Sequence, residues 1–210
     1  LSKGIITVKS VMAVSVTGLL LSGILFYRLH PFSFWLSLVA VFGLATYSYI
    51  KKNYWWGGPF HNAWIVALLP VMGYYTNLPV AETKFPNQIV PYLLITFFSY
   101  GSFVLIGYLK DIDADRATHY KTFPVMFSWN TTILTGDAFA LITLAVFWFQ
   151  AGNNAWELLF GIYGSIIIIA GQIGGHLTKI KNEVGALFPI VSTVRSFIVL
   201  HIAVTLHFQS

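Results

Sequence analysis

Seven apolar runs, most of them long enough to cross a lipid bilayer, account for the larger part of this 210-residue chain. A transmembrane α-helix needs about 20 consecutive, mostly apolar residues, and in lipid each such segment must bond its own backbone. The predicted helices are Thr7–Tyr27, Phe32–Tyr49, Asn62–Thr76, Ile89–Tyr108, Thr131–Phe149, Ala155–Gly175 and Ala186–Phe208. The third is short and contains Pro70, so we expect it to be kinked or incomplete.

Composition excludes a soluble globular domain. Hydrophobic residues make up 57% of the sequence and charged residues only 9%, whereas soluble domains carry about a quarter charged residues. The chain has no cysteine, which excludes disulfides, thiolate catalysis and cysteine-based metal sites. No soluble domain or low-complexity tract interrupts the apolar runs. We therefore predict one all-α, multi-pass transmembrane bundle over residues 1–210.

The distribution of basic residues predicts how the bundle is oriented. The N-terminus and the connections after the second, fourth and sixth runs hold Lys3, Lys9, Lys51, Lys52, Lys110, Arg116, Lys121, Lys179 and Lys181. The other side holds only Arg28 and Lys84. Cytoplasmic loops carry the excess of Lys and Arg, so we expect the first side to be cytoplasmic and the C-terminus to lie outside. Arg195 alone falls deep inside a run, and we expect it to face the bundle interior or a wet cavity.

A charged phrase follows the fourth run directly and reads Lys110-Asp111-Ile112-Asp113-Ala114-Asp115-Arg116. If the helix continues for one more turn, Asp111 and Asp115 share a face at i and i+4, and Asp113 is turned aside. Two carboxylates that are close repel unless a cation lies between them, and carboxylate oxygens suit Mg²⁺. Arg116 and Lys121 add positive charge for an anionic group. The alternative is a solvated loop whose acids pair with its bases and contribute little.

A second feature lies at the end of the second run, in Tyr47-Ser48-Tyr49-Ile50-Lys51. A tyrosine and a lysine at i and i+4 on a helix end can both point at one anion. The alternative is an interfacial tyrosine beside an ordinary cytoplasmic lysine. The number of crossings places this pair on the same membrane side as the aspartates, which favours a shared site.

Together these phrases resemble the UbiA superfamily of intramembrane prenyltransferases. The aspartate phrase and Lys121-Thr122-Phe123-Pro124-Val125 match the family's second motif, DxxxD within KDIxxDR…KTxPV, and Tyr47 to Lys51 match its YxxxK element. The resemblance covers nearly the whole chain. Two departures stand out, because His119-Tyr120 and Ser128-Trp129 occupy positions where the family usually has glycine.

The resemblance implies a fold of nine helices around a central cavity that opens sideways to lipid. The family's first motif, NDxxD, follows its second helix, whereas the second motif here follows the fourth run and no NDxxD is present. We therefore expect seven of nine helices, with the first two and their motif missing before Leu1. With the metal held from one side only, we expect these 210 residues by themselves to turn over slowly.

The resemblance also implies the chemistry, which is Mg²⁺-dependent transfer of a prenyl group from a prenyl diphosphate to a lipid-soluble acceptor. The acceptor is expected to be a quinone-type aromatic or a glycerol-phosphate lipid. Asp111 and Asp115 are the expected catalytic metal ligands, and the diphosphate is expected to contact Tyr47, Lys51, Arg116 and Lys121. Expected partners are the prenyl diphosphate, the hydrophobic acceptor and membrane lipid, with no nucleic acid.

Two other functions stay open at this point. One is an inactive or truncated relative that binds isoprenoid lipid without turnover. The other is a transporter or channel subunit, which would carry ionisable residues near the middle of the bilayer. The acids gather at one end of the helices, a pattern that favours a phosphate site at the mouth of the bundle.

Overall fold

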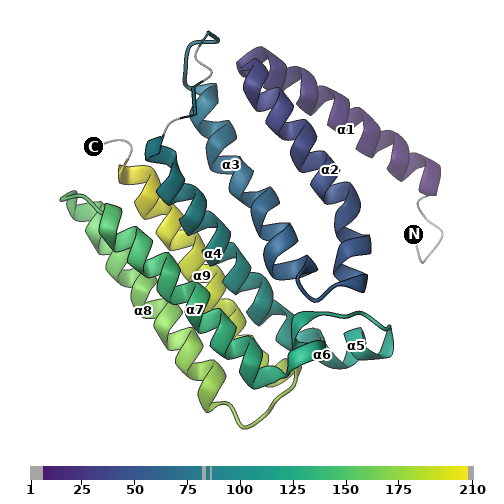
Figure 1. The fold of residues 1–210 in the computed structure, drawn as a ribbon, viewed down its shortest axis with the longest axis vertical. Coiled ribbons are helices and arrows are strands. Elements are labelled where there is room, and N and C mark those ends of the chain that lie inside the picture. Colours follow the sequence, from purple (N-terminus) through teal and green to yellow (C-terminus); the bar gives the residue numbers. More distant parts are fainter. Residues whose placement is uncertain (1–6, 82–83, 86, 208–210) are drawn as a thin grey trace.

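The computed structural model describes residues 7–81, 84–85 and 87–207, and within them the chain forms helices and no β-strand. The elements are α1 (Val8–Leu29), α2 (Pro31–Asn53), a π-helical turn η1 (Gly57–Asn62), α3 (Ala63–Thr76), η2 (Asn87–Ile89), α4 (Val90–Gly107), η3 (Tyr108–Asp111), α5 (Ile112–Ala117), α6 (Phe123–Phe127), α7 (Trp129–Gln150), α8 (Ala155–Leu177) and α9 (Glu183–His207). Figure 1 shows α1, α2 and α3 on one side, α4, α7, α8 and α9 on the other, and α5 and α6 at one end. We call this the α5 end.

The predicted all-α transmembrane bundle is confirmed. Six helical stretches of the described chain are long and apolar enough to cross a membrane. The remaining predicted run is α3, which has only 14 residues and contains Pro70. Because η1 leads directly into it, the helical segment extends over residues 57–76. The last run was predicted to end at Phe208, which lies outside the described residues; α9 ends at His207.

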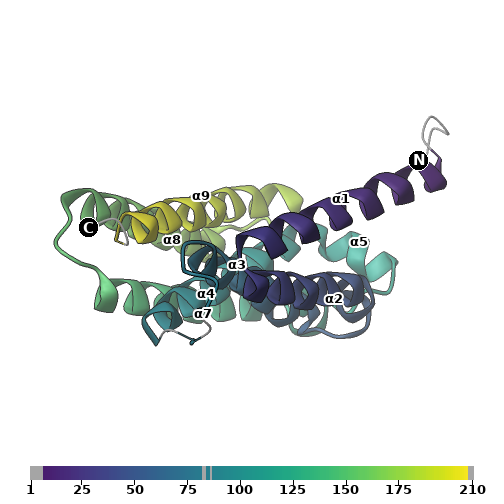
Figure 2. The same ribbon diagram turned by 90° about the horizontal axis from the view of Figure 1, so that it is seen from above.

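The hairpin of α1 and α2 lies at one edge of the bundle. His30 ends α1 and caps α2, because its Nδ1 accepts a hydrogen bond from the Phe32 amide at 3.1 Å. Pro31 follows at the first helical position, where its missing N–H costs nothing. None of the residues of α1 is buried, and Figure 2 shows this helix extending outward past its neighbours.

Helices α8 and α9 pack closely because small residues line their contact. The Ser196 hydroxyl of α9 donates a hydrogen bond to the Gly164 carbonyl of α8 at 2.8 Å. A Cβ atom added at Gly171 would lie 2.7 Å from the Cβ of Ser192. Small residues are what allow the backbones of membrane helices to approach in this way. This contact leaves Arg195 outside the packed face between α8 and α9, and its side chain is exposed. It is therefore not packed in the interior of the described bundle, and that it faces a wet cavity stays a prediction.

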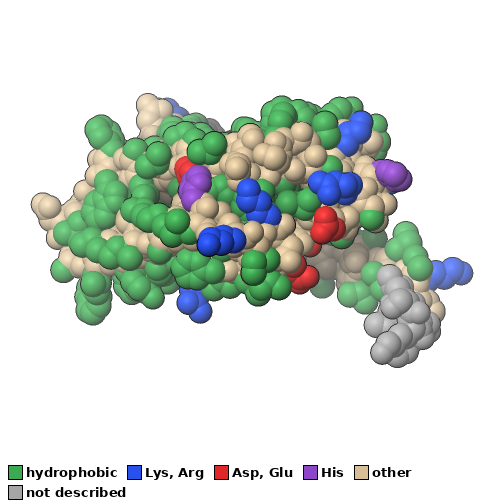
Figure 3. Space-filling model, turned by 90° about the horizontal axis from the view of Figure 1, so that it is seen from below, with side chains coloured by type: hydrophobic (Ala, Val, Ile, Leu, Met, Phe, Trp, Pro, Cys, Tyr) green, Lys and Arg blue, Asp and Glu red, His purple; other side chains and the backbone are tan. Residues whose placement is uncertain are grey.

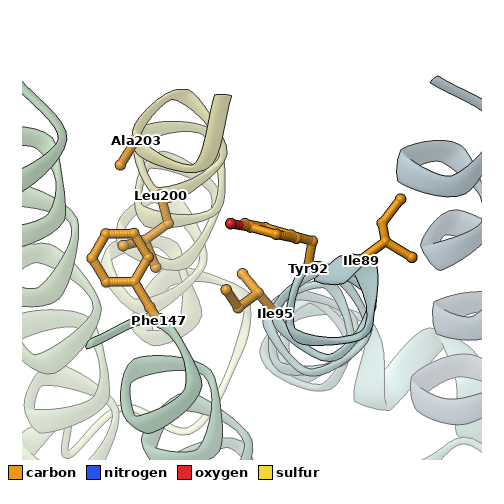
Figure 4. Packing of buried hydrophobic residues seen from close by; sticks show 6 residues of the cluster. All are labelled: Ile89, Tyr92, Ile95, Phe147, Leu200 and Ala203. Atoms are coloured by element: carbon orange, nitrogen blue, oxygen red, sulfur yellow. The ribbon is translucent and has the colours of Figure 1, made fainter. Parts of the chain in front are cut away.

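A second packed region ties α4 to α7 and α9 at the end opposite α5. Figure 4 shows its buried side chains, which are Ile89, Tyr92, Ile95, Phe147, Leu200 and Ala203. They hold the first half of α4 in place. The second half of α4 is packed as well, through Leu105 and Ile106, and it leads to the α5 end.

The α5 end carries most of the charge. Figure 3, which looks onto this end, shows blue Lys and Arg side chains with red Asp and Glu side chains among them, surrounded by apolar residues. The helix directions agree with this picture, because α2 and α4 both end here.

The contact between α8 and α9 gives a test of the fold. We expect Gly171→Val to lower the thermal midpoint in detergent, because overpacking of this kind costs about 1–3 kcal/mol and the Cβ already meets Ser192. Gly18→Val in α1 is the matched control, since no atom lies within 4 Å of a Cβ added there. Equal midpoints for the two variants would contradict the packing described.

Candidate functional site

The aspartate phrase is helical, as predicted, but its first turn is of the 3₁₀ type. η3 continues α4 beyond the apolar run, and α5 follows it directly. Asp115 is buried, with 7% of its surface exposed, and Asp111 is half-buried. The Asp113 side chain is 89% exposed. The structure thus separates Asp113 from the other two aspartates.

The loop after α5 folds back onto Asp115. Thr122 donates a hydrogen bond from its hydroxyl to Oδ2 of Asp115 at 2.9 Å, and the Tyr120 amide donates to the Asp115 carbonyl at 2.8 Å. His119, directly before Tyr120, adopts a φ of 59°, in the left-handed region. These bonds hold the carboxylate of Asp115 in one orientation.

The last turn of α2 forms the opposite wall of the site. The hydroxyl groups of Tyr47 and Tyr108 form a hydrogen bond of 3.1 Å. The Lys51 ammonium lies 4.8 Å from the ring centroid of Tyr108 and 5.4 Å from that of Tyr120. Cations are attracted to aromatic faces at such distances. Segments about 60 residues apart in sequence are thereby brought together around Lys51.

A glycine pair makes room for this arrangement. A Cβ atom added at Gly58 would lie 2.2 Å from the Tyr108 hydroxyl oxygen, and one at Gly57 would lie 2.7 Å from the backbone of Ile50. Only glycine allows η1 to pass so close to both. Neither Gly58 nor Tyr108 is singled out by the sequence pattern. The signal available was the position of Tyr108 directly before the aspartate phrase.

A row of polar groups extends from this wall into the bundle. The Asn62 amide at the end of η1 donates a hydrogen bond to the Tyr100 hydroxyl at 3.0 Å. Tyr100 in turn lies within electrostatic reach of Tyr47 and Tyr108. The site therefore has charge at its mouth and neutral hydrogen-bonding groups deeper in.

Asp115 has charged neighbours of both signs. Its carboxylate accepts the Thr122 hydrogen bond and lies within electrostatic reach of Lys51 and of Asp111. A cation bound beside the two aspartates would favour their ionised forms. Metal binding here is therefore expected to release protons.

The side chains that could hold a metal ion at this site are carboxylates. The described part of the chain holds no group of three or more His, Cys, Asp or Glu side chains that could hold a metal ion. Mg²⁺ is commonly held by one or two carboxylates, with water and substrate phosphates completing its octahedron. Asp111 and Asp115 fit such a partial site, in which the substrate supplies further ligands.

The structure does not bring all the predicted residues together. Tyr47 and Lys51 lie within electrostatic or contact range of the Asp115 region. The Arg116 guanidinium lies instead 3.6 Å from Asp113, in an ion pair whose side chains are 64% and 89% exposed. Lys121 is also exposed, although its backbone amide bonds the Lys52 carbonyl at 3.0 Å.

Comparison with known proteins supplies two matches. A family model described as the UbiA prenyltransferase family matches residues 1–187. The apo structure of a UbiA homolog from Aeropyrum pernix K1 superimposes with a TM-score of 0.72 at 15% sequence identity, over 95% of this chain and 74% of that one. At this identity the second match shows a shared fold. No curated protein sequence matches the chain significantly.

The two departures from family glycines coincide with the two non-glycine residues of positive φ in the described chain, His119 and Ser128. Ser128 combines a φ of 115° with a ψ of 165°, a region that is essentially restricted to glycine and costs about 1–3 kcal/mol in other residues. We expect Ser128→Gly to raise the thermal midpoint, because loss of the Ser128 cap costs only a few tenths of a kcal/mol. The exposed helical residue Ser48, changed to glycine, is the control and should lower it. A fall for both variants would count against the strain.

Proposed function

The chain belongs to the UbiA prenyltransferase family, and we propose that it transfers a prenyl group from an allylic prenyl diphosphate to a hydrophobic acceptor within the membrane. The main support for this proposal is the position of Lys51 at the mouth of an apolar bundle. Lys51 lies over the ring of Tyr108 and within electrostatic reach of the buried Asp115. Such a mouth suits a substrate with an anionic head and an apolar tail.

The head of the substrate would lie between α2 and α5. Lys51 would donate hydrogen bonds to diphosphate oxygens, and one hydroxyl of the Tyr47–Tyr108 pair would donate another. Asp111 and Asp115 would hold Mg²⁺, which when bound neutralises charge that develops on the leaving group. The bond between the allylic carbon and the diphosphate oxygen breaks, and the electron pair leaves with the diphosphate. An electron-rich atom of the acceptor then bonds the allylic carbon and loses its proton.

The tail of the substrate needs apolar space. A cavity of about 620 Å³ lies between α3, α4 and α9, and its lining includes Pro70, Ile89, Ile95 and Val204. Cavities of this size and character are typical of sites for apolar ligands. Its position away from the charged mouth supports a substrate that extends along the bundle.

The acceptor and the sidedness are proposed from the position and charge of the site. A quinone-type aromatic or a glycerol-phosphate lipid fits a site that opens to the membrane. The excess of Lys and Arg at the α5 end favours a cytoplasmic mouth. A transporter subunit is less well supported, because the one deep basic residue, Arg195, is exposed rather than packed inside.

The aspartates give the sharpest test. We expect Asp111→Ala and Asp115→Ala each to lower the rate by on the order of 10²–10³, because each removes preorganised charge from the leaving-group site. Asp113→Ala is the matched control, since its side chain is exposed and contacts Arg116 instead. Initial rates would be measured with Mg²⁺, a radiolabelled prenyl diphosphate and a panel of acceptors, using the longest natural form of the gene product in nanodiscs.

Binding is measured separately so that turnover and recognition are not confused. Residues 1–210 are titrated with an unreactive prenyl thiolodiphosphate, with and without Mg²⁺. Binding that requires Mg²⁺ and Lys51, without turnover in any form of the protein, would identify a lipid-binding relative instead of an enzyme. An Asp113→Ala variant as impaired as Asp115→Ala would contradict the assignment of the two metal ligands.

A further inference from the structure

An acidic side chain lies inside the membrane-spanning part of α7. Asp137 is the ninth of the 22 residues of this helix, so about 12 Å of helix separate it from the start of α7 at 1.5 Å per residue. Ionisable residues within membrane helices are rare, and they usually pair with another polar group or mark an ion site. The reaction proposed above makes no use of Asp137.

One oxygen of the Asp137 carboxylate has a partner and the other does not. His176 of α8 donates a hydrogen bond from its Nε2 atom to Oδ2 of Asp137 at 2.6 Å. An ionised carboxylate only accepts hydrogen bonds, so this nitrogen carries a proton and is not free to bind a metal ion. Oδ1 is buried and accepts no hydrogen bond from the described residues. Half of this carboxylate is therefore left uncompensated.

A second buried oxygen without a partner lies on the facing helix. Gln172 of α8 is only 7% exposed. Its Nε2 atom donates a hydrogen bond to the Ser102 hydroxyl of α4 at 3.2 Å, and that hydroxyl donates to the Gly136 carbonyl at 3.3 Å. Because the one hydroxyl proton is directed at Gly136, Ser102 presents a lone pair to Gln172 and fixes which side of the amide faces it. The amide oxygen, Oε1, is buried and has no hydrogen-bond partner in the described part of the chain.

The two oxygens belong to one contact between α7 and α8, which lie side by side in Figure 1. A Cβ atom added at Gly136, directly before Asp137, would lie 3.5 Å from both the oxygen and the nitrogen of the Gln172 amide. Gln172 and His176 share a face of α8 at i and i+4, and His176 holds the Asp137 carboxylate. Two buried acceptors are thus presented at this contact by side chains that hydrogen bonds hold in position.

We propose that Oδ1 of Asp137 and Oε1 of Gln172 bind a monovalent metal cation, Na⁺, between α4, α7 and α8. Oxygen ligands suit hard cations, and a buried acceptor or charge is costly unless a donor or a cation compensates it. The ion would connect α7 to α8 beside the hydrogen bonds that already join α8 to α4. This proposal is independent of the reaction proposed above.

The choice of ion follows from the charge and the space. One carboxylate supplies one negative charge, which a monovalent cation neutralises. Divalent ions fit less well, because Ca²⁺ takes about six to eight oxygen ligands and Mg²⁺ is usually completed by substrate phosphates. The helices also approach closely here, since the Cβ atom added at Gly136 would lie 2.9 Å from Ile106. Little space favours Na⁺ over the larger K⁺.

The test measures the thermal midpoint of the chain in nanodiscs while sodium chloride replaces choline chloride at constant ionic strength. We expect Na⁺ to raise the midpoint until the rise saturates, because a ligand that binds only the folded state stabilises it. Potassium chloride should have a smaller effect. Binding of radioactive Na⁺ to the same nanodiscs gives the affinity directly.

Three variants locate the ion. Asp137→Asn and Gln172→Leu should each lower the Na⁺ affinity by on the order of tenfold or more, because each removes a ligand oxygen or its charge. Gln172→Leu leaves the pair of Asp137 and His176 intact, so it serves where Asp137→Asn fails to fold. Gln172→Glu keeps an oxygen at the same position and should retain the rise with Na⁺. A purely structural role for Gln172 predicts instead that both of its variants lower the midpoint alike in Na⁺ and in choline.

Asp111→Ala is the control for the aspartates at the α5 end, and it should leave the effect of Na⁺ unchanged. Equal midpoints in Na⁺, K⁺ and choline, without saturable binding, would overturn the proposal and leave water as the partner of the two oxygens. An effect of Na⁺ that survives Asp137→Asn, or that is lost in Asp111→Ala, would also overturn it, because the ion would then lie elsewhere. A rise with K⁺ as large as that with Na⁺ would overturn the choice of ion.

Discussion

The rest of the site depends on the electrostatic interaction between a cation, Lys51, and a buried carboxylate, Asp115. The two lie where α2 ends and where α4 continues into α5. Lys51 lies over the rings of Tyr108 and Tyr120 and lowers the electrostatic cost of the buried Asp115. Neighbouring residues hold these side chains in position. Gly58 makes room for Tyr108, and Thr122 orients the carboxylate. Loss of any of these contacts would separate the two walls of the site.

The same requirement for charge compensation explains why two basic residues of this chain behave differently. Lys51 lies at the end of a helix, where aromatic rings and a carboxylate surround it. Arg195 lies at the centre of a helix on an exposed apolar face. In a medium of low dielectric constant, an uncompensated charge is costly wherever it lies. Lys51 is therefore compensated within the described residues, whereas Arg195 is exposed on an apolar face.

Much of the fold could be predicted from the sequence, because the length of an apolar run is set directly by bilayer thickness. The continuation of α4 and the outward direction of Asp113 also followed from helical spacing. The contact between Tyr108 and Lys51 could not be predicted, since it joins segments distant in sequence. The exposure of Arg195 could not be predicted either, because almost every face of α9 is apolar. Periodicity then carries no information, and the small residues that face α8 decide the orientation.

The backbone conformations of His119 and Ser128, which occupy positions where the family usually has glycine, could not be predicted from the sequence either. The substitutions were visible in the sequence, but the positive φ angles that glycine would accommodate appear only in the structure.

The proposed function requires that a diphosphate binds between α2 and α5. The most direct measurement is a structure determined with Mg²⁺ and a prenyl thiolodiphosphate. We predict diphosphate density within hydrogen-bonding distance of Lys51 and metal density beside Asp111 and Asp115. Diphosphate density in the cavity between α3, α4 and α9, with the region around Lys51 empty, would contradict the account.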